Sequence, residues 1–302
     1  MAKEPRSLAG KVVAITGGAR GIGEATARSL VQEGGKVAIG DLDVTLAEKT
    51  AAALGGGTIA LELDVTQRES FASFLSQVEE RLGPIDVLVN NAGIMPLGRF
   101  VDEDDATARR MVDINLHGLM FGMKLVLPSM QRRNTGHIVN IASQAGKGGF
   151  PGGATYCATK HAVVGLSEAV RGELVDTDIE ISCVMPAAVN TELAAGLVEA
   201  RGVKKIEPQD VADAVVDALK FPKFDVWVPK VSDAIFRVMT LLPRRGREVI
   251  VRALKADQVL AGADSHARAA YEDRASRSEP GIAPERAGAA ADAAAAEKVE
   301  SG

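Results

Sequence analysis

Short apolar runs alternate along this chain with longer segments of helical character. Lys11 to Ile15 (Lys-Val-Val-Ala-Ile) and Lys36 to Gly40 (Lys-Val-Ala-Ile-Gly) have the length and the β-branched content of buried strands. Helix-forming residues follow the first run from Glu24 to Leu30. Because this alternation continues from residue 11 to residue 228, it predicts an α/β fold with a doubly wound parallel sheet and helices on both faces.

A glycine-rich turn joins the first predicted strand to the first predicted helix. It reads Thr16-Gly17-Gly18-Ala19-Arg20-Gly21-Ile22-Gly23. Such glycines permit a tight turn, a close approach of the backbone to phosphate and close packing of helix on strand, and the helix N-terminus attracts anions. We therefore expect a pyrophosphate site here. A purely structural turn is the alternative, which the strand-turn-helix setting disfavours. The expected contacts are Gly17, Arg20, Gly21, Ile22 and Gly23.

Asp41 follows the second predicted strand, twenty residues after Gly21. A dinucleotide-binding fold places a carboxylate there to bind the ribose hydroxyls of the adenosine. A carboxylate repels a 2′-phosphate and favours NAD over NADP. Arg20 argues for NADP, because its guanidinium could grip that phosphate through two hydrogen bonds. Leu42 stands where a second basic residue would help NADP, so we expect NAD and keep NADP as the alternative.

Three polar residues form a proton-transfer set. Tyr156 and Lys160 are four residues apart, which on a helix places phenol and ammonium on one face. Ser143 precedes Tyr156 by thirteen residues and follows the strand-like run 137–142. The ammonium would lower the phenol pKa below its usual value of about 10, so that Tyr156 could act as a general acid or base. Taken alone, the pattern also fits a surface pair and an unrelated serine.

These motifs together resemble the short-chain dehydrogenase/reductase family in its single-domain form. The resemblance covers about residues 8 to 230. It implies seven strands in the order 3-2-1-4-5-6-7, a site at their carboxyl ends, and a homo-oligomer, either dimer or tetramer. The motifs, in the family's order, are Thr16-Gly17-x-x-x-Gly21-x-Gly23, Asp64-Val65, Asn90-Asn91-Ala92-Gly93, Asn115, Ser143 and Tyr156-x-x-x-Lys160.

The resemblance also implies a role for each motif. Tyr156 would be the acid/base at the substrate oxygen, and Ser143 would orient that oxygen. Lys160 would lower the Tyr156 pKa and bind the nicotinamide ribose, while Asn115 would interrupt its helix and hold a water that links Lys160 to solvent. The other expected contacts are Asp64 and Val65 at the adenine, Asn91, Ala92 and Gly93 at the adenosine-side ribose and nearby backbone, and Pro186, Val189 and Thr191 at the carboxamide.

One motif departs from the family pattern. After the sixth predicted strand, Glu180 to Met185, the family usually reads Pro-Gly-x-Val-x-Thr, whereas this chain has Pro186-Ala187-Ala188-Val189-Asn190-Thr191. Alanine does not readily adopt a positive φ angle. The loop that receives the carboxamide must therefore form without the freedom that a glycine gives.

Composition narrows the class of protein. The 302 residues are 46% hydrophobic, enough for a full core, and a net charge of −5 argues against general nucleic-acid binding. Neither a bilayer-spanning apolar run nor a signal peptide's apolar core is present, so we expect a cytoplasmic protein. Cys157 and Cys183 do not suggest a disulfide framework, and the four histidines lack metal-ligand spacing, so we expect no metal.

The segment after the seventh predicted strand, residues 225–228, differs in charge from the rest. Nine Lys or Arg and three carboxylates lie between Lys220 and Lys255. An amphipathic helix is predicted over 231–242, with Ser232 as N-cap and Pro243 as stop, and a basic helix over 244–260. We expect these helices to pack over the substrate mouth or on a second subunit. The alternative is peripheral contact with an anionic membrane.

We thus divide the chain into a flexible N-terminus (1–7), a Rossmann-fold NAD(P)-binding and catalytic domain (8–230), a C-terminal helical extension (231–276) and a disordered Ala-rich tail (277–302). The leading hypothesis is an NAD-dependent oxidoreductase that interconverts an apolar, lipid-like or steroid-like secondary alcohol and its ketone. The alternatives are an NADP-dependent ketoreductase and a non-catalytic NAD(H) sensor. The segments expected to line the substrate side contain Met95, Phe150, Met185 and Leu193.

Overall fold

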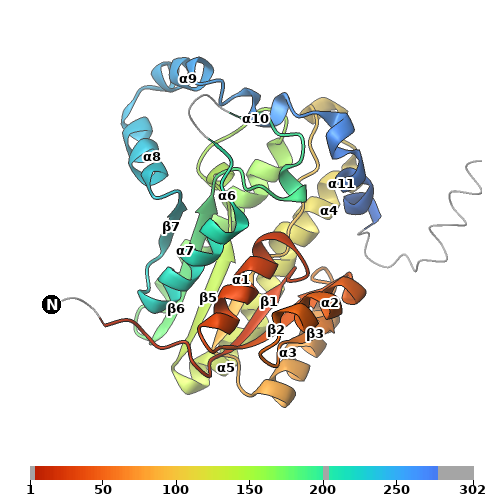
Figure 1. Cartoon of the computed structure of the whole chain (residues 1–302). Coiled ribbons are helices and arrows are strands. Elements are labelled where there is room, and N and C mark those ends of the chain that lie inside the picture. Colours follow the sequence, from red (N-terminus) through yellow and green to blue (C-terminus); the bar gives the residue numbers. More distant parts are fainter. Residues whose placement is uncertain (1–3, 200–203, 278–302) are drawn as a thin grey trace, which may run out of the picture.

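Residues 4–199 and 204–277 are described by a computed structural model (Figure 1). The described residues form a fold with a central parallel sheet of seven strands. The strand order is β3-β2-β1-β4-β5-β6-β7. The predicted fold class, strand number and strand order are confirmed. The strands are β1 (Val12–Thr16), β2 (Lys36–Asp41), β3 (Ile59–Glu62), β4 (Val87–Asn90), β5 (Gly136–Ile141), β6 (Ile179–Pro186) and β7 (Asp225–Val228).

Helices cover both faces of the sheet. Helices α1, α2 and α7 share one apolar core with it, and α3, α5 and α6 share the other. Helix α4 continues into α5 through a π-helical stretch, Asp113–Gly118. The bounds are α1 (Gly21–Gln32), α2 (Val44–Leu54), α3 (Arg68–Leu82), α4 (Asp105–Val112), α5 (Leu119–Arg133), α6 (Ala154–Glu173) and α7 (Pro208–Lys220).

Strand β1 shows why the strands read as continuous apolar runs. Val12 and Ala14 belong to the core under α3, α5 and α6, whereas Val13 and Ile15 belong to the core under α1, α2 and α7. All four are at most 4% exposed. Since successive side chains of a strand point to opposite faces and both faces are covered, apolar residues are favoured at successive positions.

The parallel register brings the carboxyl ends of the strands to one edge of the sheet. Thr16 ends β1, Asp41 ends β2, Asn90 ends β4 and Pro186 ends β6. The loops that follow these residues contain the predicted motifs, so the fold alone gathers segments that are far apart in sequence.

The C-terminal extension forms an arch at this edge (Figure 1). It comprises α8 (Val231–Leu241), α9 (Arg244–Ala253), α10 (Gln258–Ala261) and α11 (Ser265–Arg277). The prediction of a single helix over 244–260 was wrong. Helix α9 ends at Ala253, because Lys255 adopts a positive φ of 55°, which interrupts the helical backbone. Ser232 is not the N-cap of α8, which is Lys230; the Ser232 hydroxyl instead accepts a hydrogen bond from Gln144 Nε2 at 2.8 Å. The predicted stop near Pro243 is confirmed.

Most residues at the two ends of the chain are not among those that the structure describes. The residues of the Ala-rich tail from 278 onward, and residues 1–3, fall outside the described residues. At the other end of residues 1–7, the Arg6 N–H donates to the Lys220 carbonyl at 3.0 Å. The expected flexibility of both termini stays a prediction. None of the described helices combines the length and apolar character needed to cross a bilayer.

Phe74→Ala should test the packing that supports the end of β2. The Phe74 side chain is fully buried, and a Cβ added at Gly40 would lie 2.9 Å from its ring. Removing the ring leaves a cavity, so the free energy of unfolding should fall by about 3–5 kcal/mol in chemical denaturation. Phe100→Ala, at a side chain 69% exposed, is the matched control and should change it by less than about 0.5 kcal/mol. Equal losses in the two variants would contradict this account.

Candidate active site

The glycine turn forms a cradle for a phosphate group. Gly17 and Gly21 have φ angles of 63° and 58°, which favour glycine. A Cβ at Gly23 would lie 2.2 Å from the Gly17 carbonyl oxygen, so a larger residue could not pack there. Helix α1 begins at Gly21, and its N-cap residue, Arg20, makes no side-chain capping bond. The first N–H groups of α1 therefore remain available to an anion, as a dinucleotide pyrophosphate requires.

Thr16 and Asn91 join the glycine turn to the loop after β4. The Thr16 hydroxyl accepts hydrogen bonds from the N–H groups of Asn91 and Ala92, both at 3.0 Å. The Asn91 side-chain amide donates to the carbonyls of Thr16 and Gly17, both at 2.9 Å. The side chain of Asn91 thus shapes the cradle. The sequence analysis included Thr16 in the glycine motif but assigned it no role. Its hydroxyl positions the loop after β4.

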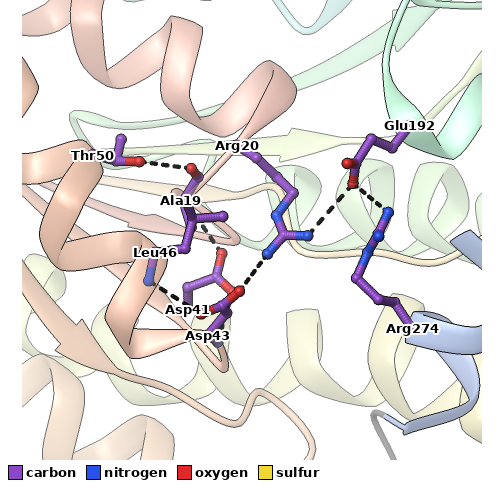
Figure 2. Close-up of polar contacts among 8 residues, drawn as sticks. All are labelled: Ala19, Arg20, Asp41, Asp43, Leu46, Thr50, Glu192 and Arg274. Atoms are coloured by element: carbon purple, nitrogen blue, oxygen red, sulfur yellow. Dashed lines mark hydrogen bonds and ion pairs between the residues drawn. The ribbon is translucent and has the colours of Figure 1, made fainter. Parts of the chain in front are cut away.

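Asp41 lies beside an ion-pair chain at the adenosine end (Figure 2). Its carboxylate accepts hydrogen bonds from the N–H groups of Ala19 at 3.0 Å and Asp43 at 3.1 Å. Burial raises the pKa of Asp41, and these two bonds oppose the rise. The Arg20 guanidinium donates to Asp43 at 2.7 Å and to Glu192 at 3.5 Å, so two carboxylates already hold it.

Ser143 follows the carboxyl end of β5, and Tyr156 and Lys160 lie in the first two turns of α6. The three residues line the same cavity. Burial raises the pKa of Tyr156 to about 12, although the hydrogen bond with Ser143 opposes the rise. Burial likewise lowers the pKa of Lys160 to about 8. The expected lowering of the Tyr156 pKa by Lys160 is not seen, because desolvation outweighs the ammonium, which lies 5.7 Å from the ring centroid and donates to the Ile141 carbonyl at 2.9 Å.

Asn115 sits inside the π-helical stretch between α4 and α5. Its side-chain amide donates to the Ile94 carbonyl at 2.9 Å and to the Thr159 hydroxyl at 3.2 Å, and its oxygen accepts from the Ile94 N–H at 2.8 Å. The predicted interruption of the helix is therefore a local widening rather than a break. Asn115 ties the loop after β4 to α6, the helix that carries Tyr156 and Lys160.

All predicted site residues except Gly23 and Asn115 line one cavity of about 1720 Å³. Gly23 and Asn115 are buried behind it. The cavity exceeds the usual range of ligand pockets, about 300–1,000 Å³, so it can take a dinucleotide and a second molecule. Met185, for which the sequence left open a place at the substrate side or in the core, lies fully buried in the sheet. Apolar lining residues include Met95, Phe150, Leu193, Leu197, Phe236 and Met239.

The loop after β6 completes the cofactor side. The Ala187 N–H donates to the Val228 carbonyl at 2.8 Å, and Ala187 is not among the described non-glycine residues with a positive φ. The departure from the family pattern is thus accommodated without backbone strain. A Cβ at Gly21 would lie 3.3 Å from Thr191 Cγ2, so Thr191 lies against the glycine turn. Among the described residues, no group of three or more His, Cys, Asp or Glu is placed to hold a metal ion.

Comparison with known proteins agrees with this geometry. The family model described as short chain dehydrogenase matches residues 11–202. The chain belongs to the short-chain dehydrogenase/reductase family. Such enzymes are oxidoreductases that act on CH–OH groups with a nicotinamide cofactor.

Two similar proteins are named for different substrates. A 2,5-dichloro-2,5-cyclohexadiene-1,4-diol dehydrogenase of Sphingobium indicum is 37% identical over 193 residues, 63% of this chain and 77% of the relative. A sorbitol dehydrogenase of Cereibacter sphaeroides is 39% identical over 186 residues, 61% of this chain and 73% of the relative. A short-chain dehydrogenase/reductase of Burkholderia phymatum, solved in complex with NAD, has a TM-score of 0.72 at 25% identity and covers 78% of this chain and 94% of its own.

Helix α11 lines part of the cavity of this short-chain dehydrogenase. The side chain of Arg268 is 2% exposed, and its guanidinium donates to the carbonyls of Met95 at 2.7 Å and of Leu193 and Ala195 at 3.0 Å. The Tyr271 hydroxyl, also at the cavity, accepts a hydrogen bond from the Met95 N–H at 2.6 Å. One helix thus joins the loops after β4 and β6, both of which line the cavity. Sequence reasoning did not identify either residue.

Arg268→Met should show how much these loops depend on α11. The change leaves the buried Met95 carbonyl and the partly buried carbonyls of Leu193 and Ala195 without this donor, so the free energy of unfolding should fall by about 1–3 kcal/mol in chemical denaturation. Arg109→Met, at an exposed position of α4, is the matched control and should be nearly neutral. An unchanged stability of Arg268→Met would mean that the loops hold their positions without the guanidinium.

Proposed function

We propose that this protein is an NAD-dependent dehydrogenase or ketoreductase that interconverts an apolar secondary alcohol and its ketone. One observation carries the proposal: Ser143, Tyr156 and Lys160 line the same cavity as the glycine turn and Asp41. A proton-transfer set and a dinucleotide cradle in one cavity are what alcohol oxidation by hydride transfer requires. Production of NADH from secondary alcohols, measured by absorbance across a panel of substrates, tests it directly.

The proposed mechanism assigns proton handling to the protein. A bound nicotinamide cofactor would supply the hydride chemistry. Tyr156 takes the hydroxyl proton during oxidation and returns a proton to the carbonyl oxygen during reduction, while Ser143 orients that oxygen. Lys160, held by the Ile141 carbonyl, would bind the nicotinamide ribose and stabilise the phenolate. With its pKa near 12, Tyr156 is a phenol at neutral pH, which suits the reductive direction.

NAD is the proposed cofactor because the carboxylates at the adenosine end disfavour a 2′-phosphate. Asp41 stands where the ribose hydroxyls would bind, and Arg20 is held between Asp43 and Glu192. A guanidinium with two carboxylate partners must give up those contacts before it can grip a phosphate. The NAD in the related Burkholderia phymatum structure agrees with this preference.

The apolar cavity wall supports a lipid-like, steroid-like or aliphatic substrate. Met95, Phe150 and Leu193, three of the four residues expected to line the substrate side, are at the cavity. Its volume of about 1720 Å³ leaves room for a large apolar body beside a dinucleotide. We further propose a cytoplasmic homo-oligomer, dimer or tetramer, in keeping with the oligomers common in the family.

The two alternative functions would use the residues of the site differently. An NADP-dependent ketoreductase would use Arg20, which would have to leave its carboxylate partners. A non-catalytic NAD(H) sensor would need no proton relay, yet Asn115, Ser143, Tyr156 and Lys160 are all retained and three of them line the cavity. A sensor would bind NADH but show no turnover with any alcohol or ketone.

Tyr156→Phe should lose turnover by about 10²–10⁴-fold, since it removes the proton-transfer oxygen and keeps the ring. NADH binding, followed by fluorescence, should persist. In the wild type, oxidation should speed up from about pH 6 to 7, because the phenolate fraction grows toward the Tyr156 pKa of about 12 while Lys160, with a pKa of about 8, remains largely charged. Lys160→Met should move this rise to higher pH. A pH-independent oxidation rate, or near-normal turnover of Tyr156→Phe, would refute the assignment.

Cofactor preference should respond to two single changes. Asp41→Ala removes a ribose acceptor and a repulsive charge, so it should weaken NAD binding and improve the relative use of NADP. Asp43→Asn keeps an acceptor for the Leu46 N–H, to which Asp43 now bonds at 3.1 Å, but it releases Arg20 and should also favour NADP. Steady-state kcat/KM with each cofactor measures both effects. A wild type that prefers NADP tenfold or more would reverse the proposed assignment.

A further inference from the structure

Helices α8 and α9 expose apolar faces that amphipathic helices normally bury. Val231, Val238, Leu241 and Val249 are 61%, 59%, 84% and 67% exposed. Ser232 is the only buried residue of α8, and α9 has none. The expected burial of this stripe is therefore not achieved within the described residues. We call the exposed side chains of residues 230–255 the α8–α9 surface.

The same surface is cationic. Seven Lys or Arg and two carboxylates lie between Lys230 and Lys255, in a chain whose net charge is −5. Three of the cations form exposed ion pairs, with Asp217, Asp233 and Glu248. The other four are exposed and have no carboxylate partner within the part of the chain that the structure describes. They are Arg245, Arg247, Arg252 and Lys255.

The surface borders the active-site cavity. Ile235 of α8 and Ile250 of α9 line the cavity while remaining 49% and 37% exposed, and Leu254 lines it at 41% exposed. Helix α8 follows the edge strand β7, and α9 forms the outer part of the arch (Figure 1). An extended partner could therefore meet both helices at the rim of the cavity.

Charge decides between the candidate partners. A second copy paired through a two-fold axis would bring the same four unpaired cations against each other, because such an interface uses one patch twice. Repulsion between like charges opposes that contact. An anionic lipid surface satisfies both features at once, since amphipathic basic helices insert apolar residues at the acyl boundary and keep cations at the headgroups.

We propose that the α8–α9 surface docks on an anionic lipid surface. Val238, Leu241 and Val249 enter the boundary between headgroups and acyl chains, and Arg245 and Arg252 contact lipid phosphates. The docked protein holds the rim of its cavity next to the lipid. This binding does not depend on the proposed reaction, so it is measured without a substrate.

Vesicle co-sedimentation of the full chain tests the proposal. It should bind vesicles of phosphatidylcholine with phosphatidylserine at low salt, bind pure phosphatidylcholine much more weakly, and be released by high salt. Arg245→Gln with Arg252→Gln should weaken binding by roughly 30-fold, because each cation near an anionic surface contributes a factor of about five. Val238→Ser with Leu241→Ser should also weaken it, with circular dichroism confirming the fold.

Lys36→Gln with Arg132→Gln, two exposed cations elsewhere, is the charge-matched control and should leave binding unchanged. An equal loss in this control would show general attraction of charge and overturn the proposal. So would failure of the full chain to bind at low salt, or binding only by a chain that ends at residue 277, which would mean that residues 278–302 occupy the surface. A dimer mass that falls to a monomer in Val238→Ser with Leu241→Ser would assign the surface to a second copy instead.

Discussion

The parallel register of the sheet is the constraint on which the rest of the structure depends. Every strand of this sheet runs the same way, so the loops that carry Gly17, Asp41, Asn91, Ser143 and Thr191 all emerge at one edge. Reversal of β1, β2, β4, β5 or β6 would send one of these residues to the opposite edge. The continuous apolar content of the strands follows from the same constraint, because parallel sheets are covered on both faces.

Three charged groups at the site have backbone partners. Lys160 donates to a carbonyl, Asp41 accepts from two N–H groups, and Arg268 binds three carbonyls. Burying such groups costs free energy, which well-aligned hydrogen bonds offset. Since backbone partners move little, the side chains are already oriented for a ligand, and desolvation lowers the pKa of Lys160 and raises the pKa of Asp41.

Much of this architecture could be predicted from the sequence, because its signals are local. The glycine spacing, the apolar strands and the pair Tyr156 and Lys160 each lie within a few residues. The missed features depend on distant contacts: Arg268 bonds to residues more than seventy positions away, and the Tyr156 pKa depends on burial that no local pattern reveals. Helix boundaries in the extension failed for a similar reason, since Lys255 adopts a positive φ without a glycine to signal it.

The ion-pair chain at the adenosine end has a consequence for the C-terminal helix. Glu192 accepts from Arg20 at 3.5 Å and from Arg274 of α11 at 2.6 Å, so one carboxylate connects the glycine turn to the last described helix (Figure 2). Coupling between sites is thermodynamically reciprocal. If a dinucleotide orders Arg20, it also stabilises α11, and any partner that pulls α11 away loosens the grip on the dinucleotide. A single acidic side chain would then link occupation of the cofactor site to the position of the extension.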